Sequence, residues 1–240
     1  MTNLIIDIGN TRSKLFAFNG NQLIDHIVCS DSLSEISHFI EKNECKQGIL
    51  STTAKLTLKA EHQINGLPFD ILRMTGNTPT PVKVRYKTPK TLGTDRLAAI
   101  VAAQDMKPRS NILVIDCGTC VTYDILDAEG NYWGGNISPG LNMRLQAMHN
   151  LTAKLPLVTA DGDLPDVGYD TQTAIRSGAI LGLRHEIEGF ISHFKQKFTT
   201  LSVFLTGGDA KKLGMSEESC IFAADYLVPY GLNLILNYNK

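Results

Sequence analysis

The sequence lacks an excess of charge of either sign: 23 Lys and Arg stand against 24 Asp and Glu, a formal net charge of −1 over 240 residues. This balance argues against an electrostatically driven nucleic-acid binder, which normally carries a basic excess or stripe. Long apolar runs are also lacking, since the longest, residues 97–103, is far below the roughly 18 residues that suggest a membrane span. With 43% hydrophobic residues, the composition is that of a globular protein of one large or two small domains.

The chain also lacks a recognisable secretory signal, because no basic region precedes an apolar stretch and a small-residue cleavage site. Its five cysteines, Cys29, Cys45, Cys117, Cys120 and Cys220, are an odd number. Both features favour reduced thiols and a cytoplasmic location. One pair, Cys117 and Cys120, has CxxC spacing. No second CxxC or spaced histidine pair accompanies it, so we interpret the spacing as incidental rather than as a zinc or redox site.

What the sequence does contain is an internal similarity between residues 3–11 and 111–119. Each segment is an apolar, β-branched run followed by Asp-x-Gly and then by a hydroxyl or amide residue. A second strand-like stretch follows each turn, at residues 14–18 and 121–126. The pattern predicts strand, turn, strand in both places, as in a duplication of two α/β halves rather than a short solenoid repeat.

The remaining predicted elements alternate between helices and strands. Helices are predicted at residues 32–41, 95–106 (with Thr94 as its cap), 171–198 (as one or two helices) and 232–237. Strands are predicted at residues 47–51, 69–73 and 201–206, and an irregular segment at 75–90. This alternation predicts an α/β fold with mixed sheets. The boundary is expected near residues 107–110, giving halves 1–108 and 109–240.

The two Asp-x-Gly turns suggest phosphate chemistry. Glycine lets backbone N–H groups approach an anion closely, whereas an aspartate beside phosphate is useful when it holds a bridging cation. Two such turns, one per half, would face each other across a cleft and bind one polyphosphate from both sides. The alternative for each turn alone is an ordinary strand end.

Two further glycine-containing segments precede helices. Asp95 and Arg96 open an alanine-rich helix, where Asp95 either complements the helix dipole or orients and deprotonates a substrate hydroxyl. Arg96 either neutralises a substrate carboxylate or phosphate, or forms a surface ion pair. Residues 206–209 (TGGD) either lie against an adenosine or form a plain turn. The chain has no Walker pattern and no GxGxxG.

Together these segments resemble the type III pantothenate kinase family, which belongs to the superfamily of acetate and sugar kinases, actin and heat-shock chaperones. The resemblance extends over nearly the whole chain. Its motifs are residues 7–14 (DIGNTRSK), 86–96 (YKTPKTLGTDR), 116–124 (DCGTCVTYD), 134–140 (GGNISPG) and 206–209 (TGGD). The resemblance implies two ribonuclease-H-like (actin-like) halves, each a mixed sheet flanked by helices, with a cleft between them.

The resemblance also implies the site residues. ATP-binding residues would be Asp7, Ile8, Gly9, Asn10, Thr11, Arg12, Ser13, Lys14 and Thr119. Pantothenate-binding residues would be Tyr86, Gly93, Thr94, Asp95, Arg96 and Thr171, with Thr173 a nearby rival to Thr171. Asp95 would be the base. Asp7 would lie near Mg²⁺, directly or through water, and Asp116 would bind a monovalent cation, K⁺ or NH₄⁺. The family usually has a small apolar residue where Cys120 stands.

The implied function is ATP-dependent phosphorylation of pantothenate to 4'-phosphopantothenate, the first step of coenzyme A biosynthesis. The expected assembly is a homodimer that binds neither nucleic acid nor membrane. The alanines of the helix at 95–106 could form its interface or pack within one subunit. Two alternatives remain at this point: a kinase for another small hydroxyl metabolite, and a non-catalytic nucleotide-binding accessory factor in transcription.

Overall fold

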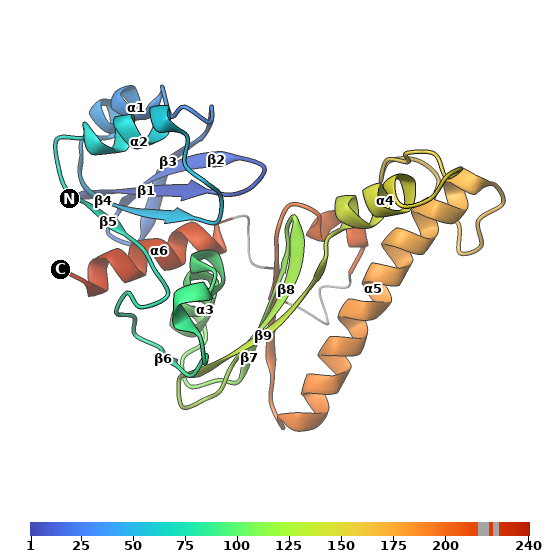
Figure 1. Ribbon diagram of the computed structural model, residues 1–240. Coiled ribbons are helices and arrows are strands. Elements are labelled where there is room, and N and C mark those ends of the chain that lie inside the picture. Colours follow the sequence, from blue (N-terminus) through green and yellow to red (C-terminus); the bar gives the residue numbers. More distant parts are fainter. Residues whose placement is uncertain (216–220, 223–225) are drawn as a thin grey trace. The chain divides into compact units, whose positions relative to one another are not determined.

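The computed structural model describes residues 1–215, 221–222 and 226–240, and the chain divides into two compact units (Figure 1). Unit 1 comprises Met1–Met106, Gly130–Tyr132 and Tyr226–Lys240, and unit 2 comprises Lys107–Glu129 and Trp133–Asp225. The chain passes from one unit to the other at Met106. Its C-terminal helix, which the sequence analysis grouped with residues 109–240, packs with unit 1. Cys220, expected to be a reduced thiol, lies outside the described residues.

Unit 1 is built on a mixed five-stranded sheet in the order β3-β2-β1-β4-β5. Its strands are β1 (Thr2–Ile8), β2 (Ser13–Asn19), β3 (Gln22–Cys29), β4 (Cys45–Thr52) and β5 (Ile71–Arg73). The central strand β1 is antiparallel to β2 and parallel to β4. Leu4, Ile6 and Leu15 are fully buried on one face, because alternate residues of a strand point to the same side.

Helices cover both faces of this sheet (Figure 1). They are α1 (Ile36–Asn43), α2 (Leu58–Asn65), α3 (Thr94–Met106) and α6 (Leu227–Tyr238). The helix predicted at 32–41 begins four residues later, because Leu33 has a positive φ of 54° and its carbonyl closes a turn with the Ile36 N–H. The α6 helix is twice as long as its predicted core, and α2 was not predicted.

The alanine-rich face of α3 is already covered within the chain. Ala98, Ala99, Ala102 and Ala103 are all buried, and α3 packs along α6. At the contact, a Cβ on Gly231 would lie 1.8 Å from the Ala98 carbonyl oxygen, so only glycine permits this approach. These alanines therefore lie in contacts within one subunit, made mainly with α6 rather than with the sheet that the sequence suggested, and their use in a dimer interface stays a prediction.

The segment predicted to be irregular, residues 75–90, contains two short elements before α3. The strand β6 (Lys83–Val84) pairs with Asn131 and Tyr132, and the 3-10 helix η1 (Pro89–Thr91) follows. The Arg85 guanidinium also donates to the Asn131 side chain at 3.0 Å. These contacts fix the part of the chain that carries Tyr86.

Unit 2 repeats the strand arrangement of unit 1. Its strands are β7 (Ile112–Cys117), β8 (Cys120–Leu126), β9 (Asn131–Pro139, entering from unit 1), β10 (Ser202–Thr206) and β11 (Ile221–Phe222). They follow the order β11-β10-β7-β8-β9. The strand β7 is antiparallel to β8 and parallel to β10, as β1 is to β2 and β4. The predicted duplication of two α/β halves with mixed sheets is confirmed.

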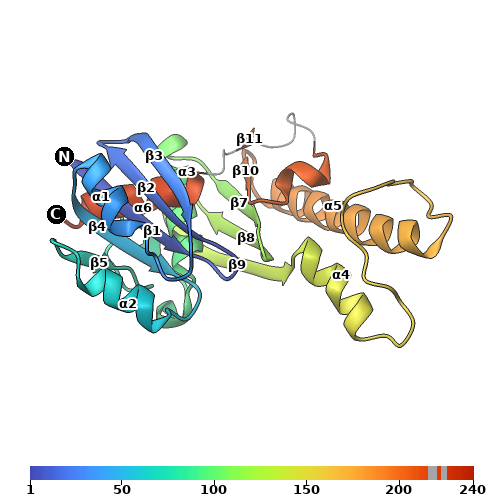
Figure 2. The same ribbon diagram turned by 90° about the horizontal axis from the view of Figure 1, so that it is seen from above.

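Two helices and a 3-10 helix complete unit 2: α4 (Leu141–Asn150), α5 (Thr171–Lys197) and η2 (Ala210–Leu213). Seen from above, α5 is one continuous helix of 27 residues (Figure 2). It includes Gly178, Gly182 and Gly189, which are exposed and each cost about 1 kcal/mol of helix stability relative to alanine. No helix among the described residues is both long and apolar enough to cross a membrane.

Candidate functional site

The first Asp-x-Gly turn lies in unit 1, between β1 and β2. Residues 9–12 form it, and the Gly9 N–H donates to the Arg12 carbonyl at 3.1 Å. Asn10, Thr11 and Arg12 are exposed, whereas Ser13 and Ile8 are buried at the strand ends. The turn is therefore an accessible loop with a rigid base, as a phosphate-binding hairpin requires.

Asp7 is the next-to-last residue of β1 and lies directly across from Lys14 on β2. Burial raises the pKa of Asp7 to about 6, although the Lys14 ammonium lowers it and the Asp95 carboxylate raises it further. Asp7 and Asp95 thus lie close enough to repel each other, although they are 88 positions apart in the chain. Such a perturbed carboxyl group is a common sign of a functional site.

The start of α3 is hydrogen-bonded to β4, the strand that lies parallel to β1 beside Asp7. The sequence predicts a helix from Asp95 with Thr94 as its cap, but α3 begins at Thr94 itself. The buried Thr94 hydroxyl is hydrogen-bonded to Ser51 of β4 at 2.8 Å, and Ser51 is the register neighbour of Asp7. This contact fixes the first turn of α3 beside Asp7. Sequence reasoning missed Ser51, whose only signal is a polar residue at the end of an apolar strand.

The Asp95 carboxylate is held at the first turn of the helix, where Oδ1 accepts from the Arg96 N–H at 2.8 Å. A Cβ on Gly93 would lie 2.5 Å from that same oxygen, so glycine is needed for the carboxylate to lie over the backbone. The Gly93 carbonyl accepts from the Leu97 N–H and continues the helix. The geometry keeps Asp95 at a defined position rather than free in solvent.

Arg96, next to Asp95 in the chain, contacts the side chain of Tyr86 within unit 1. The Arg96 guanidinium carbon lies 5.8 Å from the centre of the Tyr86 ring, and Arg96 is only 7% exposed. A cation stacked on an aromatic ring is oriented as well as stabilised. A planar guanidinium so placed can bind a carboxylate in two hydrogen bonds.

The second Asp-x-Gly turn lies in unit 2 and is more tightly packed. Only Gly118 and Thr119 separate β7 from β8, and the Gly118 N–H donates to the Cys120 carbonyl at 3.2 Å. Asp116 is partly buried and Thr119 is exposed. A Cβ on Gly207, whose φ is 97°, would lie 2.5 Å from the Asp116 Oδ1, so the TGGD turn presses directly on this aspartate.

The CxxC spacing belongs to this turn and is not a reactive pair. Cys117 is 1% exposed and packs in the hydrophobic core of unit 2, while Cys120 is partly exposed. The described cysteines are all free thiols. Cys117 therefore behaves as a small hydrophobic residue, as the interpretation of this spacing as incidental requires.

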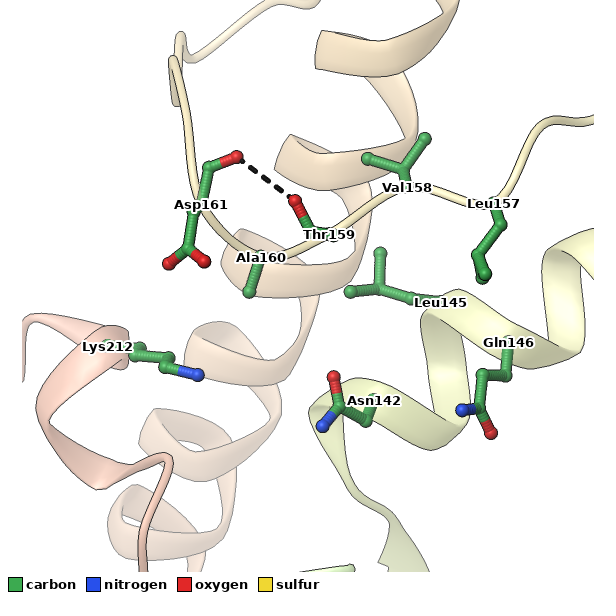
Figure 3. Close-up of a pocket in the computed structure, with 9 residues that line it drawn as sticks. All are labelled: Asn142, Leu145, Gln146, Leu157, Val158, Thr159, Ala160, Asp161 and Lys212. Carbon is green, nitrogen blue, oxygen red and sulfur yellow. Dashed lines mark hydrogen bonds between the residues drawn. The ribbon is translucent and has the colours of Figure 1, made fainter.

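A small cavity of about 310 Å³ is lined in part by Lys212 of η2, the 3-10 helix that follows the TGGD turn (Figure 3). Lys212 of η2 extends into it, and α4 and the loop at 157–161 form the opposite sides. Leu145, Val158 and Ala160 make its apolar part. The Lys212 ammonium also pairs with Asp209 at 3.2 Å.

Of the two threonines proposed to contact substrate, Thr173 is committed to the fold. Its hydroxyl and backbone N–H complete a capping box with Asp170, with the N–H at 2.7 Å from the carboxylate. Thr171 is the exposed first residue of α5. The hydroxyl of Thr171 is thus the one that faces solvent at the helix N-terminus.

The oxygen donors present suit hard cations. Among the described residues, no group of three or more His, Cys, Asp and Glu side chains could hold a metal ion by itself. Asp7 offers one carboxylate, which matches Mg²⁺ bound jointly by protein, phosphate and water. Asp116 offers one partly buried carboxylate beside the second turn.

Comparison with known proteins agrees with this geometry. Residues 3–193 match the family model of type III pantothenate kinase. A type III pantothenate kinase from Phocaeicola vulgatus is 48% identical over 238 residues, covering 99% of this chain and 98% of the relative. One from Porphyromonas gingivalis is 39% identical over 242 residues, with 99% and 98% covered.

Solved structures show the fold alone, because their sequence identities are low. The activator of 2-hydroxyisocaproyl-CoA dehydratase from Clostridium difficile, solved with bound ADPNP, has a TM-score of 0.55 at 10% identity. The comparison covers 100% of this chain and 97% of that one. Such neighbours confirm the predicted actin-like architecture. By its family model and its relatives, this chain belongs to the type III pantothenate kinase family.

Proposed function

We propose that this chain transfers the γ-phosphoryl group of ATP to the hydroxyl of pantothenate, giving 4'-phosphopantothenate, the first step of coenzyme A biosynthesis. One observation carries the proposal: unit 1 brings Asp7, Lys14 and Asp95 together at the C-terminal end of β1. Arg96, the residue after Asp95, is stacked on the Tyr86 ring. Family membership supports it, since relatives named for this activity match nearly the whole chain.

In this mechanism Asp95 accepts the proton of the pantothenate hydroxyl as its oxygen attacks the γ-phosphorus. The bond from that phosphorus to the bridging oxygen breaks, and ADP leaves. Because the transition state of phosphoryl transfer is loose, orientation of the hydroxyl matters more than the strength of the base. The exposed residues 10–12 of the hairpin turn and the Lys14 ammonium bind phosphate, while Arg96 binds the pantothenate carboxylate.

Two cations complete the proposal. Mg²⁺ near Asp7, bound directly or through water, supplies charge neutralisation on the phosphates. A monovalent cation, K⁺ or NH₄⁺, is assigned to Asp116. The raised pKa of Asp7 supports its role, because a buried carboxylate beside another acid is stabilised when a cation joins it.

Unit 2 is assigned the remaining contacts. Thr119 would contact ATP, and the TGGD turn with the neighbouring cavity would take the adenosine, since that cavity combines apolar walls with amide and ammonium groups. Thr171 would contact pantothenate, because its hydroxyl is exposed while that of Thr173 is used in the cap. Binding of one triphosphate by both turns, a homodimer and a cytoplasmic location stay predictions.

The test is a coupled assay of ADP formation with pantothenate, Mg²⁺ and K⁺, comparing wild type with Asp95→Asn. We expect turnover to fall by roughly 10²–10⁴-fold while affinity for a non-hydrolysable ATP analogue stays within about twofold. Asp105→Asn is the matched control, since Asp105 is exposed at the other end of α3 and accepts from Tyr230.

A near-normal rate for Asp95→Asn would refute the assignment of the base. A screen of other hydroxylated metabolites addresses the substrate: preference for one of them over pantothenate would move the function to the alternative kinase. Nucleotide binding by the wild type without turnover of any of them would favour the accessory-factor alternative.

A further inference from the structure

A carboxylate that the proposed mechanism does not use, Glu186, collects side chains from three other elements of unit 2. Glu186 lies on α5 and accepts hydrogen bonds from Tyr123 of β8 at 2.7 Å and from Ser138 of β9 at 2.5 Å. It also pairs with the guanidinium of Arg144, in the first turn of α4. The carboxylate and guanidinium are each about three-quarters buried, so this is not a surface ion pair.

The donors around Glu186 require a carboxylate. Two hydroxyls and a guanidinium need an acceptor with both oxygens available, whereas an amide has one oxygen and would place an N–H against a donor. Burial raises the pKa of Glu186, but the hydrogen bonds from Ser138, Tyr123 and Arg144 together bring it below the ordinary value. Burial and Glu186 also raise the pKa of Tyr123, which keeps its hydroxyl a donor.

This network holds the segment that joins β9 to α4. Besides pairing with Glu186, Arg144 donates from Nε to the Pro139 carbonyl at 2.8 Å. Ser138 is the residue before Pro139, so two of the three residues that Glu186 binds, Ser138 and Arg144, flank one short stretch of backbone. Their positions leave this stretch little freedom to move away from the sheet.

The held segment lies directly on the second Asp-x-Gly turn. A Cβ on Gly140 would lie 2.4 Å from the Thr119 carbonyl oxygen and 2.5 Å from that of Gly118. On another side of the turn, Gly207 presses on Asp116, and the Asp209 N–H donates to the Cys117 carbonyl at 3.1 Å. The Gly140 contact is supported by the Glu186–Arg144 network, whereas the TGGD contact is supported by the Asp209–Lys212 ion pair.

We propose that Glu186 is a positioning residue for the Asp116–Thr119 turn: by holding Ser138 and Arg144, it keeps Pro139 and Gly140 against that turn and so fixes the groups assigned to ATP and the monovalent cation. The inference rests on the proposed function for those two ligands. Glu186 itself touches neither reacting group, and its effect on phosphoryl transfer is indirect. Positioning groups of this kind are needed because a small displacement of a binding turn strongly lowers its affinity for the ligand.

The test compares Glu186→Gln with wild type and with Glu188→Gln, an exposed glutamate on the same helix that pairs only with His185. We expect Glu186→Gln to raise KM for ATP and the half-saturating K⁺ concentration roughly tenfold, with KM for pantothenate within about twofold. Glu188→Gln should match wild type in all three. Because a purely structural role would lower the population of folded enzyme, it would reduce apparent kcat without this split.

Two further variants keep the inference open to refutation if Glu186→Gln does not fold. Ser138→Ala removes one donor without changing charge, and Arg144→Lys keeps the charge but cannot reach both Pro139 and Glu186. Both variants should also raise KM for ATP and the half-saturating K⁺ concentration, but by less than Glu186→Gln does. Unchanged constants in the folded variants, or equal increases for ATP and pantothenate, would overturn the assignment.

Direct binding separates this inference from the proposed function. Calorimetry with AMP-PNP, Mg²⁺ and K⁺ measures nucleotide affinity without turnover. If wild type binds AMP-PNP but does not phosphorylate pantothenate, the proposed function fails while the Glu186 comparison still stands or falls on the measured affinities. If wild type is active and Glu186→Gln binds AMP-PNP as tightly, only the inference about Glu186 fails.

Discussion

The two Asp-x-Gly hairpins share one strand framework but differ in what surrounds them. In each, the aspartate is the next-to-last residue of a central strand that is antiparallel to the next strand and parallel to a third. The similarity extends to the third strand, where Ser51 neighbours Asp7 and Thr206 neighbours Asp116. A hydroxyl residue therefore occupies the same register position beside each aspartate, which the sequence similarity alone does not reveal.

The differences lie in the turn and in the residue opposite the aspartate. The unit 1 turn has four residues and is largely exposed, whereas the unit 2 turn has two and lies against Gly140 and Gly207. Asp7 faces Lys14 across the strands, but Asp116 faces Thr122. The unit 1 hairpin thus has a lysine ammonium opposite its aspartate, whereas the unit 2 hairpin has a neutral residue at that position. This difference agrees with assigning the bound monovalent cation to Asp116.

Alanine at Gly140, which packs against the unit 2 turn, and at Gly9, which lies in the unit 1 turn, gives the largest expected difference between the two hairpins. Gly140→Ala should lower the free energy of unfolding by about 2–4 kcal/mol, because its methyl group would meet two backbone oxygens that cannot move independently. Gly9→Ala should cost less than about 1 kcal/mol, since its Cβ would lie 3.5 Å from the Arg12 carbonyl oxygen, an ordinary contact. Urea denaturation of both variants measures the contrast, and equal costs would contradict the difference in packing.

Much of this framework follows from local sequence. The β-branched runs before each Asp-x-Gly predict β1 and β7, and the apolar run at 97–103 predicts α3. Elements with few buried positions were missed: α2 buries only Ala60 and Ile64, and α4 only Leu141 and Leu145. The strand β9 contains Gly134, Gly135 and Pro139, which are typical of loops.

The candidate site, like the fold, could be predicted from the sequence only where its residues form a local pattern. Residues of the hairpin and of the first turn of α3 belong to contiguous motifs, so a sequence can reveal them. Ser51 and Glu186 act through partners more than 40 positions away, Thr94 for Ser51 and Arg144 for Glu186. A single polar residue in an apolar strand or a long helix has no local signal of such a role.

Burial of Asp7 and repulsion from Asp95, opposed in part by Lys14, make the stability of unit 1 depend on the protonation of Asp7. Its pKa in the folded protein is about 6, above the ordinary 3.8, so between these values the folded state holds a proton that the unfolded chain has released. Stability therefore falls as pH rises through this window and is lowest above about pH 6. Asp7→Asn should remove this loss, stabilising the metal-free protein by about 3 kcal/mol at about pH 8 while reducing kinase activity.

Denaturation curves from about pH 4 to about pH 8 measure this effect. The matched variant is Asp25→Asn, because hydrogen bonds from Lys42 and Asn43 lower the pKa of Asp25. That shift has the opposite sign: its stabilisation is present above the ordinary pKa and is lost as pH falls, so Asp25→Asn should destabilise the protein near neutrality. A parallel pH dependence of the two variants would contradict the assigned environment of Asp7.

The smallest expected effect concerns the two cysteines that flank the unit 2 turn. Cys117 packs in the core, 1% exposed, so neither oxidants nor zinc can reach it without opening the sheet. Initial rates with and without reductant should therefore be equal, and Cys120→Ser should match wild type. A loss of activity that reductant restores, and that Cys117→Ser abolishes, would instead show that the turn opens far enough for Cys117 to react. That outcome would remove the main contrast with unit 1, because it requires the Gly140 and Gly207 contacts to separate in the native protein.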